Sequence, residues 1–256
     1  MEREIALRLT AARAAARLAG DMIHRERPES VTRKGMNDYV TEMDVKSERT
    51  IRQYLLSRFP QDAFWGEEGG ECGRGRFEWI VDPIDGTTNY IKNLPLYTVS
   101  IGLSMDGEWV AGCVYAPAMG EMYWAQKGQG AYLNDRPIHV SGEETLGRAV
   151  VGMSFAHRNA ECGKRMLDLL PRLTGGVNDL RRMGSAAYDL CQVAAGRLDA
   201  FLELDLNAYD IAAGTVIARE AGAVVTGWAE GEAFEQTGNI LSSTPALHRG
   251  LREILR

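Results

Sequence analysis

Residues 79–90 read Trp-Ile-Val-Asp-Pro-Ile-Asp-Gly-Thr-Thr-Asn-Tyr, and the rest of the chain is organised around them. The apolar run 79–81 is typical of the end of a buried strand. Asp82 and Asp85 follow it, with a rigid proline between them. Like charges that close repel and raise each other's pKa, and a cation between them removes that cost. Gly86 allows unusual backbone angles and close ligand approach, so the stretch predicts one site for a divalent metal and a phosphate.

The composition is that of an ordinary soluble globular protein. The chain has 256 residues, of which 45% are hydrophobic and 25% charged, enough for one large domain or two modest ones. The net charge of −6 and the lack of any long basic run argue against nucleic acid as a general partner. An anionic substrate stays open, because a bound metal reverses the local sign of charge.

Cysteine usage and hydropathy predict a cytoplasmic protein. No two cysteines have the close spacing of a zinc or redox site, and a chain of this size needs no disulfides, so we expect reduced thiols. Residues 1–27 carry Arg and Glu throughout, which predicts that there is no signal peptide. No run of about 18 apolar residues occurs, so we expect no membrane span and no membrane partner. The cysteines are Cys72, Cys113, Cys162 and Cys191.

The first part of the chain predicts helices. Residues 2–24 repeat apolar side chains at helical spacing, and we expect the Arg-rich opposite face to be solvated. Residues 31–44 have a loop-like composition. Thr41 or Asp44 is positioned to cap a following helix that runs to about Phe59.

Short strands dominate the middle of the chain and alternate with helices after it. The pattern becomes β from 97 to 133, with turn signals between the strands. The first part of the chain is helical, the middle is β, and helices and strands alternate after it. This order predicts an α+β fold of layered sheets and helices. We predict a single domain over residues 1–256, with a soft division into 1–143 and 144–256. Later strands are expected at 149–153, 197–203, 224–226 and 240–242, and later helices at 161–173, 184–195, 209–221 and 245–255.

Three acid positions stand out from the general surface: Glu67, the pair Asp82 and Asp85, and Asp210. Each has a simpler interpretation on its own: a solvated loop acid for Glu67, a turn for the pair, and an interaction with the helix dipole for Asp210. The apolar run before Asp82 weakens the turn interpretation, because it directs the pair against buried structure. Oxygen-only ligands fit Mg²⁺, Mn²⁺ or Ca²⁺.

The sequence lacks the motifs that other catalytic chemistries require. The histidines have no metal spacing, so they are expected on the surface and zinc is disfavoured. The sequence has no nucleophile turn of the Gly-x-Ser-x-Gly type and no Walker-type phosphate loop. Metal-assisted hydrolysis by a metal-bound water is the chemistry that remains. The histidines are His24, His139, His157 and His248.

These motifs together resemble the inositol monophosphatase family. Residues 82–90, Asp-Pro-Ile-Asp-Gly-Thr-Thr-Asn-Tyr, resemble its first signature, and 209–214, Tyr-Asp-Ile-Ala-Ala-Gly, its second. Gly-Glu-Glu at 66–68 lies at the usual interval upstream. Residues 34–44 and 127–134 are similar to the bacterial inositol-1-monophosphatase branch. Three motifs in register make the resemblance specific, and it covers most of the chain.

The resemblance implies a five-layer αβαβα sandwich of the sugar-phosphatase type. It implies hydrolysis of a small phosphorylated polyol or sugar, most directly myo-inositol 1-phosphate. It further implies two or three Mg²⁺ ions per site, with Mn²⁺ as an alternative, together with inhibition by Li⁺ and a homodimer.

Roles for individual residues follow from the resemblance by position. The implied metal ligands are Glu67, Asp82, the Ile84 carbonyl, Asp85 and Asp210. The implied catalytic residues are Asp44, Thr87 and Glu67, of which Asp44 and Thr87 orient the attacking water. The implied substrate-binding residues are Ile84, Asp85, Gly86, Thr87, Arg181, Ala186, Glu203 and Asp210. Gly86 and Thr87 would receive the phosphate, and Glu203 would contact inositol hydroxyls.

The substrate side leaves alternatives open. An edge-strand charge explains Arg181 as well as a substrate contact does, and Arg182 is the alternative for that contact. Tyr209 stands where the second signature usually has Trp, which leaves the packing around the substrate undetermined. The pair 88–89, Thr-Asn, favours the inositol branch over nucleotide-bisphosphate and histidinol-phosphate phosphatases, whereas fructose-1,6-bisphosphatase relatives share the pattern. A regulatory protein associated with RNA polymerase or the ribosome is the alternative of another class, although intact ligands favour an enzyme.

Overall fold

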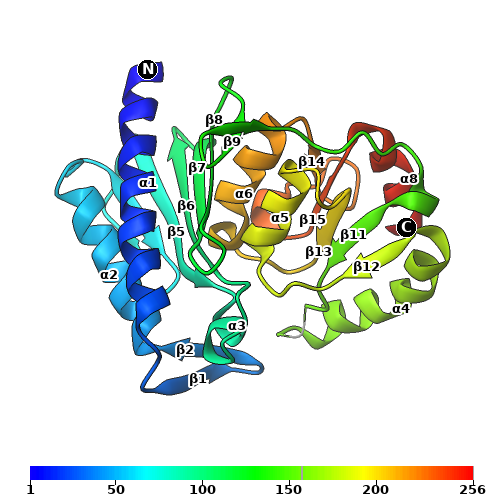
Figure 1. Cartoon of the computed structure of the whole chain (residues 1–256), viewed down its shortest axis with the longest axis horizontal. Coiled ribbons are helices and arrows are strands. Elements are labelled where there is room, and N and C mark those ends of the chain that lie inside the picture. Colours follow the sequence, from blue (N-terminus) through cyan, green and yellow to red (C-terminus); the bar gives the residue numbers. More distant parts are fainter. Residues whose placement is uncertain (157, 256) are drawn as a thin grey trace.

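Sheets and helices alternate across the molecule in five layers (Figure 1). The structure, a computed structural model, describes residues 1–156 and 158–255. Helices α1 (Glu2–Arg25) and α2 (Glu42–Leu56) form the first layer, and helices α5 (Ala186–Ala194) and α6 (Ala208–Glu220) form the third. Helices α4 (Ala160–Gly176) and α8 (Pro245–Leu255) form the fifth. A sheet fills each space between these layers, which confirms the predicted α+β class and αβαβα order.

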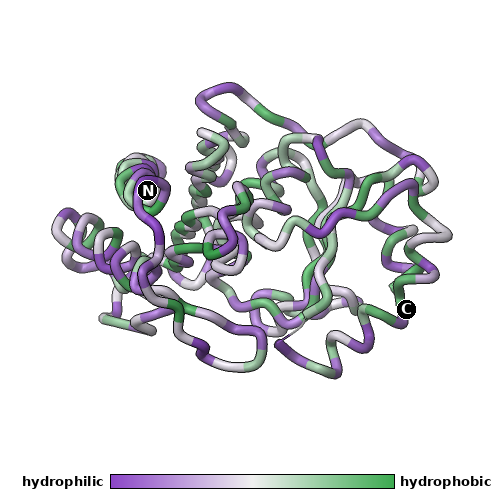
Figure 2. Tube along the Cα trace, turned by 60° about the horizontal axis from the view of Figure 1, so that its bottom comes forward, coloured by the Kyte–Doolittle hydropathy of each residue, from purple (hydrophilic) through white to green (hydrophobic). Residues whose placement is uncertain are grey.

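Helix α1 packs on the first sheet through small residues. Ala12, Ala15, Ala16 and Ala19 are at most 2% exposed, so the helix approaches the strands closely. The outer helices carry both hydrophilic and hydrophobic residues along their length (Figure 2), as expected for helices with one buried face.

The prediction of a solvated Arg face on α1 is wrong for Arg8. Its Nε and Nη2 both lie 2.8 Å from the carboxylate oxygens of Asp62. Its guanidinium also covers the rings of Phe59 and Phe77. A planar cation with a long apolar stem satisfies both kinds of neighbour, so Arg8 is half-buried rather than solvated.

The first large sheet is mostly antiparallel. Only β3 and β5 run parallel among its neighbouring strands in the described residues. The antiparallel block predicted for 97–133 is therefore confirmed. Along the sheet the strands are β10 (Arg136–Ile138), β9 (Ala131–Leu133), β8 (Glu121–Gln126), β7 (Glu108–Ala116), β6 (Thr98–Met105), β5 (Phe77–Asp85), β3 (Ala63–Gly66) and β4 (Gly70–Cys72).

The second large sheet is mixed and lies between the third and fifth layers. Its strands in order are β12 (Asp179–Arg181), β11 (Val150–Met153), β13 (Ala200–Glu203), β15 (Ile240–Ser243) and β14 (Val224–Thr226). Short helical turns complete the described elements: α3 (Thr87–Ile91), η1 (Leu146–Arg148) and α7 (Phe234–Thr237). Residues 139–149 connect the two sheets at the predicted soft division, and the prediction of a single domain stays a prediction.

The segment 31–44 is not the loop that its composition predicts. It forms a hairpin of β1 (Val31–Gly35) and β2 (Asp38–Thr41), outside both large sheets. Every residue of β1 is exposed, so the strand has no alternation of buried and polar residues that a sequence pattern reports. Thr41 and Asp44 then form a capping box at the start of α2, as predicted.

The prediction that the histidines lie on the surface is wrong for His248. This residue is 8% exposed, and its two ring nitrogens lie 2.9 Å from the Ser243 hydroxyl and 3.0 Å from the Thr226 hydroxyl. His24 and His139 are exposed, and His157 lies outside the described residues. Within the described ranges, no helix combines the length and apolar character that crossing a bilayer requires.

Candidate metal centre

A bulge at the end of β5 turns two carboxylates to the same side. Asp82 pairs with Ser100 and Asp85 pairs with Thr98, so a three-residue step on β5 faces a two-residue step on β6. In a regular strand, residues three apart point to opposite faces. The extra residue removes that alternation. The strand therefore continues through Asp85 instead of ending at Val81, and the bulge lets Asp82 and Asp85 converge.

Asp210 joins this pair from α6. One carboxylate oxygen from each of Asp82, Asp85 and Asp210 lies within 4.8 Å of the other two, and all three residues are at most 8% exposed. Asp210 also accepts a hydrogen bond from the Asn207 N–H at 2.7 Å, as part of a helix cap. The capping interpretation of Asp210 is therefore confirmed, and its carboxylate also lies in the cluster of buried acids.

The buried acids need a countercharge. Burial, followed by the charges of Glu67, Asp85 and Asp210, raises the pKa of Asp82 well above its ordinary value. Burial and the neighbouring acids also raise the pKa of Asp210. Three buried carboxylates this close are costly to ionise without a cation. An oxygen-only donor set of this kind fits a hard divalent cation such as Mg²⁺.

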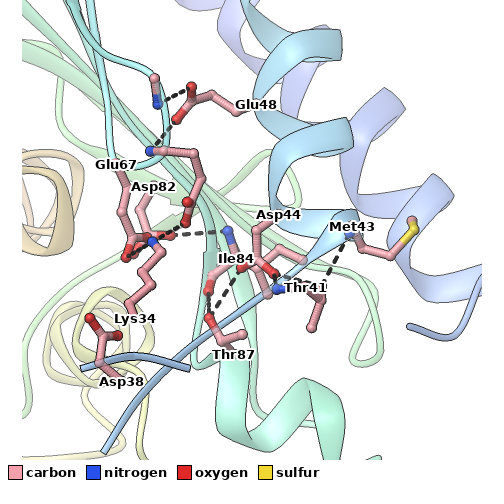
Figure 3. A network of polar contacts seen from close by, with 12 residues as sticks. Lys34, Asp38, Thr41, Met43, Asp44, Glu48, Glu67, Asp82, Ile84 and Thr87 are labelled. Atoms are coloured by element: carbon pink, nitrogen blue, oxygen red, sulfur yellow. Dashed lines mark hydrogen bonds and ion pairs between the residues drawn. The ribbon is translucent and has the colours of Figure 1, made fainter. Parts of the chain in front are cut away.

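Glu67 approaches the site from the turn between β3 and β4, and Glu48 of α2 holds that turn. The Glu48 carboxylate accepts hydrogen bonds from the N–H groups of Glu68 at 2.7 Å and Gly69 at 2.8 Å (Figure 3). The Glu67 carboxylate interacts with Asp82, and its side chain is 11% exposed. It lies beside the three converging acids and completes an acidic cluster.

Asp44, Thr87 and Ile84 lie next to one another, near Asp82 and Glu67 (Figure 3). The Thr87 hydroxyl lies 2.9 Å from the Ile84 carbonyl oxygen and 3.2 Å from Asp44 Oδ1. Asp44 Oδ2 accepts hydrogen bonds from the N–H and hydroxyl of Thr41. Burial raises the pKa of Asp44 to about 6. The contact between Asp44 and Thr87 brings together the two residues predicted to orient water.

Asp85 is fixed by the start of α5. Its Oδ2 accepts hydrogen bonds from the Ser185 hydroxyl at 2.6 Å and the Ala187 N–H at 2.8 Å. Gly86 follows with φ of 90°, and a Cβ there would lie 2.9 Å from the Leu96 carbonyl oxygen. Glycine is the residue that accommodates both constraints.

A cavity of about 100 Å³ opens beside these acids. Residues from both halves of the chain line it, so the site lies where the two sheets and the middle helices meet. Burial raises the pKa of Glu203, on its wall, to about 7. The predicted site residues among its lining are Asp85, Gly86, Thr87, Ala186, Glu203 and Asp210.

Comparison with known proteins agrees with this geometry. The sequence model of the inositol monophosphatase family matches residues 5–256. The chain belongs to the inositol monophosphatase family. It is 41% identical to the inositol-1-monophosphatase of Rhizobium meliloti over 228 residues, which cover 88% of this chain and 86% of that protein.

Relatives that are named Nus factor SuhB are as similar to this chain as relatives that are named inositol-1-monophosphatase. The chain is 41% identical to Nus factor SuhB of Vibrio cholerae over 248 residues, which cover 94% of this chain and 92% of that protein. The crystal structure of the extragenic suppressor protein suhB from Bartonella henselae superposes with a TM-score of 0.93 at 36% identity, and 96% of this chain and 97% of that chain are covered. The inositol monophosphatase family thus includes close relatives with two different names.

Within this inositol monophosphatase fold, the two candidate arginines lie differently. Arg181 forms an ion pair with Asp179 at 2.6 Å and is absent from the lining of the cavity, as far as the described residues show. Arg182 is part of that lining. Of the two arginines, Arg182 is therefore the one whose position at the cavity fits a substrate contact, and its role stays a prediction.

Sequence reasoning missed Arg158 and Glu48. Arg158 lines the cavity and forms an ion pair with Asp38 of the hairpin at 3.2 Å, and no motif or periodicity marked it. Glu48 did carry a signal, because it lies four residues after Asp44 and therefore on the same face of α2. Tyr209, where the family's second signature usually has Trp, packs edge-on against Trp65 with ring centroids 6.3 Å apart.

Proposed function

We propose that this protein hydrolyses a small phosphate monoester with Mg²⁺, and that the substrate is myo-inositol 1-phosphate, giving inositol and phosphate. The observation that carries the proposal is the convergence of Asp82, Asp85 and Asp210 beside a cavity with the polar side chain of Glu203 on its wall. Family membership supports a phosphatase. The inositol-1-monophosphatase relative supports this substrate.

The metal would be held by oxygen atoms alone. We propose Glu67, Asp82, the Ile84 carbonyl, Asp85 and Asp210 as its ligands, for two or three Mg²⁺ ions, with Mn²⁺ as an alternative. When bound, Mg²⁺ supplies Lewis-acid polarisation of the phosphoester and lowers the pKa of a water molecule.

Asp44 and Thr87 would orient the attacking water. The Thr87 hydroxyl has one proton, which it donates either to Asp44 Oδ1 or to the Ile84 carbonyl. Its oxygen lone pairs then stay free to accept a hydrogen bond from water. Above its pKa of about 6, Asp44 is a carboxylate. Asp44 Oδ1 and the Ile84 carbonyl are then both acceptors, and they keep the Thr87 hydroxyl hydrogen directed towards themselves. Glu67 would act with them as the third catalytic residue.

The substrate would lie along the cavity. The backbone N–H groups of Gly86 and Thr87 would bind phosphoryl oxygens and neutralise their charge. Glu203 would accept hydrogen bonds from the polyol hydroxyls, with Ala186 beside it. Both residues line the same cavity as Gly86, which lets one small ester reach all of them.

A panel of phosphate esters tests this proposal. Phosphate release would be measured with Mg²⁺ from myo-inositol 1-phosphate, fructose 1,6-bisphosphate, histidinol phosphate and a nucleotide bisphosphate, with and without Li⁺. We expect myo-inositol 1-phosphate to be the best substrate and Li⁺ to inhibit. Folded Asp85→Asn should lose turnover, whereas Asp106→Asn, in an exposed turn, should not. Release of phosphate from fructose 1,6-bisphosphate at a higher kcat/KM would transfer the assignment to that alternative.

A second candidate function comes from the relatives named Nus factor SuhB. Under it the protein is a regulatory partner of RNA polymerase or the ribosome, and the metal site is not needed for that role. Complementation separates the two candidates, since a purely regulatory role predicts that Asp85→Asn keeps the cellular function.

The remaining properties are proposals on the same basis. We expect a cytoplasmic homodimer without general nucleic-acid binding or a membrane partner. Light scattering on the purified protein tests the dimer.

A further inference from the structure

The side chain of Asn89 joins segments from both halves of the chain at the border of the cavity. Asn89 lies on α3, shortly after Gly86, and is 6% exposed. Its Nδ2 donates hydrogen bonds to the carbonyl oxygens of Leu96 at 2.6 Å and Met183 at 2.8 Å, and the Gly184 carbonyl oxygen lies 3.5 Å away. Since a carbonyl oxygen only accepts, the nitrogen of the amide must face these groups. One buried amide therefore ties the turn before β6 to the connection between β12 and α5.

This connection, residues 182–184, has few other ties. It follows the end of β12 and precedes the first residue of α5. Among the described residues, no backbone-to-backbone hydrogen bond involves residues 182–184. The Met183 side chain packs against apolar clusters, but apolar packing is not directional. The hydrogen bonds that orient the carbonyls of this connection, within the described ranges, therefore come from Asn89.

The same contact lies directly beside Arg182. A Cβ added to Gly184 would lie 3.2 Å from Asn89 Nδ2 and 3.3 Å from Arg182 Nη1, so the amide and the guanidinium both lie against Gly184. Gly184 and Arg182 both line the cavity. Burial raises the pKa of Glu203, which also lines it, to about 7, and the charge of Arg182 opposes that rise. The guanidinium therefore acts on the cavity from a position next to the Asn89 contact.

The contact also lies against the turn that is proposed to receive the phosphate. A Cβ added to Gly86 would lie 2.9 Å from the Leu96 carbonyl oxygen and 3.1 Å from the Gly184 carbonyl oxygen, and both of these oxygens face the Asn89 amide. A buried acceptor that loses its donor costs more than a hydrogen bond normally contributes, so these carbonyls would move to find another partner. The spacing between Gly86 and Arg182 therefore depends on this amide.

We propose that Asn89 is a positioning residue for substrate binding: its amide holds residues 182–184 against the turn at Gly86 and so places the Arg182 guanidinium where it contacts the phosphate ester. The inference rests on the proposed phosphatase function. It deepens that function, because it gives Asn89 of the first signature a defined part on the substrate side. Asn89 lines the cavity, but its N–H groups are engaged by carbonyls of the chain, so it acts through Arg182.

A double-mutant cycle in steady-state kinetics tests the proposal, with the full chain, Mg²⁺ and the ester of the panel that the wild type hydrolyses best. Asn89→Ala should raise KM about tenfold and leave kcat within about threefold of the wild type, as expected when binding alone is weakened. Asn89→Ala/Arg182→Ala should raise KM no more than about twofold beyond Arg182→Ala, because both changes remove one contact.

Two more variants complete the test. Asn178→Ala is the matched control, because it removes the same amide from an exposed position just before β12, and KM should stay within about twofold of the wild type. Gly184→Ala approaches the contact from the other side and keeps the test decisive if Asn89→Ala does not fold. It should also raise KM, without adding to the effect of Arg182→Ala. Circular dichroism checks that each variant is folded.

The possible failures are distinguishable. Additive effects of Asn89→Ala and Arg182→Ala, about 100-fold in KM together, would overturn the role of Asn89. A wild-type KM in folded Asn89→Ala, or in Arg182→Ala, would overturn it as well, and each of these results leaves the proposed function standing. A wild-type protein that releases phosphate from none of the esters would overturn the proposed function, and this inference with it.

Discussion

Asp85→Asn should make the metal-free protein more stable than the wild type and should remove the stabilisation that Mg²⁺ gives to the wild type. The asparagine Oδ1 can keep the hydrogen bonds that Asp85 accepts from Ser185 and Ala187, so the start of α5 is preserved. The change removes a charge whose ligand oxygen lies within 4.8 Å of those of Asp82 and Asp210. In EDTA the variant therefore loses repulsion, and in Mg²⁺ it loses a ligand.

The magnitude follows from that distance. At 4.8 Å and an effective dielectric constant of about 20, one pair of like charges costs about 3.5 kcal/mol, and partial protonation of the acids lowers the gain to about 1–3 kcal/mol. For a chain of this size, that corresponds to a rise in Tm of about 3–8 °C. A ligand at about 100 times its Kd stabilises the native state by about 2.7 kcal/mol, which the wild type gains and the variant does not.

Differential scanning calorimetry at pH 8, in EDTA and in saturating Mg²⁺, measures both effects. Asp106→Asn is the control and should follow the wild type in both buffers. A Tm for Asp85→Asn below the wild type in EDTA would refute the repulsion argument. A rise in Mg²⁺ as large as that of the wild type would refute the assignment of Asp85 as a ligand.

Three further predictions concern other residues. Burial, helped by the charge of Arg252, lowers the pKa of His248 from 6.5 to about 4, so the folded state resists a proton that the unfolded state binds. The stability that this provides is complete above pH 6.5 and is lost as pH falls towards 4, by about 1–3 kcal/mol. Urea unfolding across this pH range should show a smaller fall in the free energy of unfolding for His248→Gln than for the wild type. Parallel pH profiles of the two proteins would contradict the argument. Gly86→Ala should lower kcat/KM by about 100-fold or more, because the new Cβ displaces the phosphate-binding turn, and steady-state kinetics on a variant shown to be folded measures it; near-normal kcat/KM would contradict this. Arg182→Ala should raise KM for the phosphate ester about tenfold or more through a lost charged contact, whereas Arg181→Ala should not, and the reverse order would restore the original assignment to Arg181.

The main elements were predictable because they depend on local patterns. The apolar repeat of 2–24 and the capping residues Thr41 and Asp44 act within one helix, so their positions are visible in the sequence. The β block of 97–133 is likewise marked by its turns and β-branched residues. The hairpin at 31–41 was missed, because strands without a buried face have no period to detect.

The site was predictable only in part. Motif spacing, through family resemblance, pointed to Asp82, Asp85 and Asp210, and the structure brings their carboxylates together. Glu48 and Arg158 act on segments distant in the chain, the β3–β4 turn and the hairpin. No motif marked Arg158, and the spacing of Glu48 from Asp44 indicated only a shared face of α2. The contacts themselves depend on where another element packs.

By itself, the sequence determined the main helices and the β block, the acids that converge in the cluster and the family that the chain resembles. Those properties follow from burial periodicity and from residue spacing along one segment. Only the tertiary structure decided that a bulge turns Asp82 and Asp85 to one side, that Arg182 lines the cavity, and that Lys34 pairs with Glu68. Side-chain direction and charge pairing between distant segments depend on packing in three dimensions, which the linear pattern does not contain.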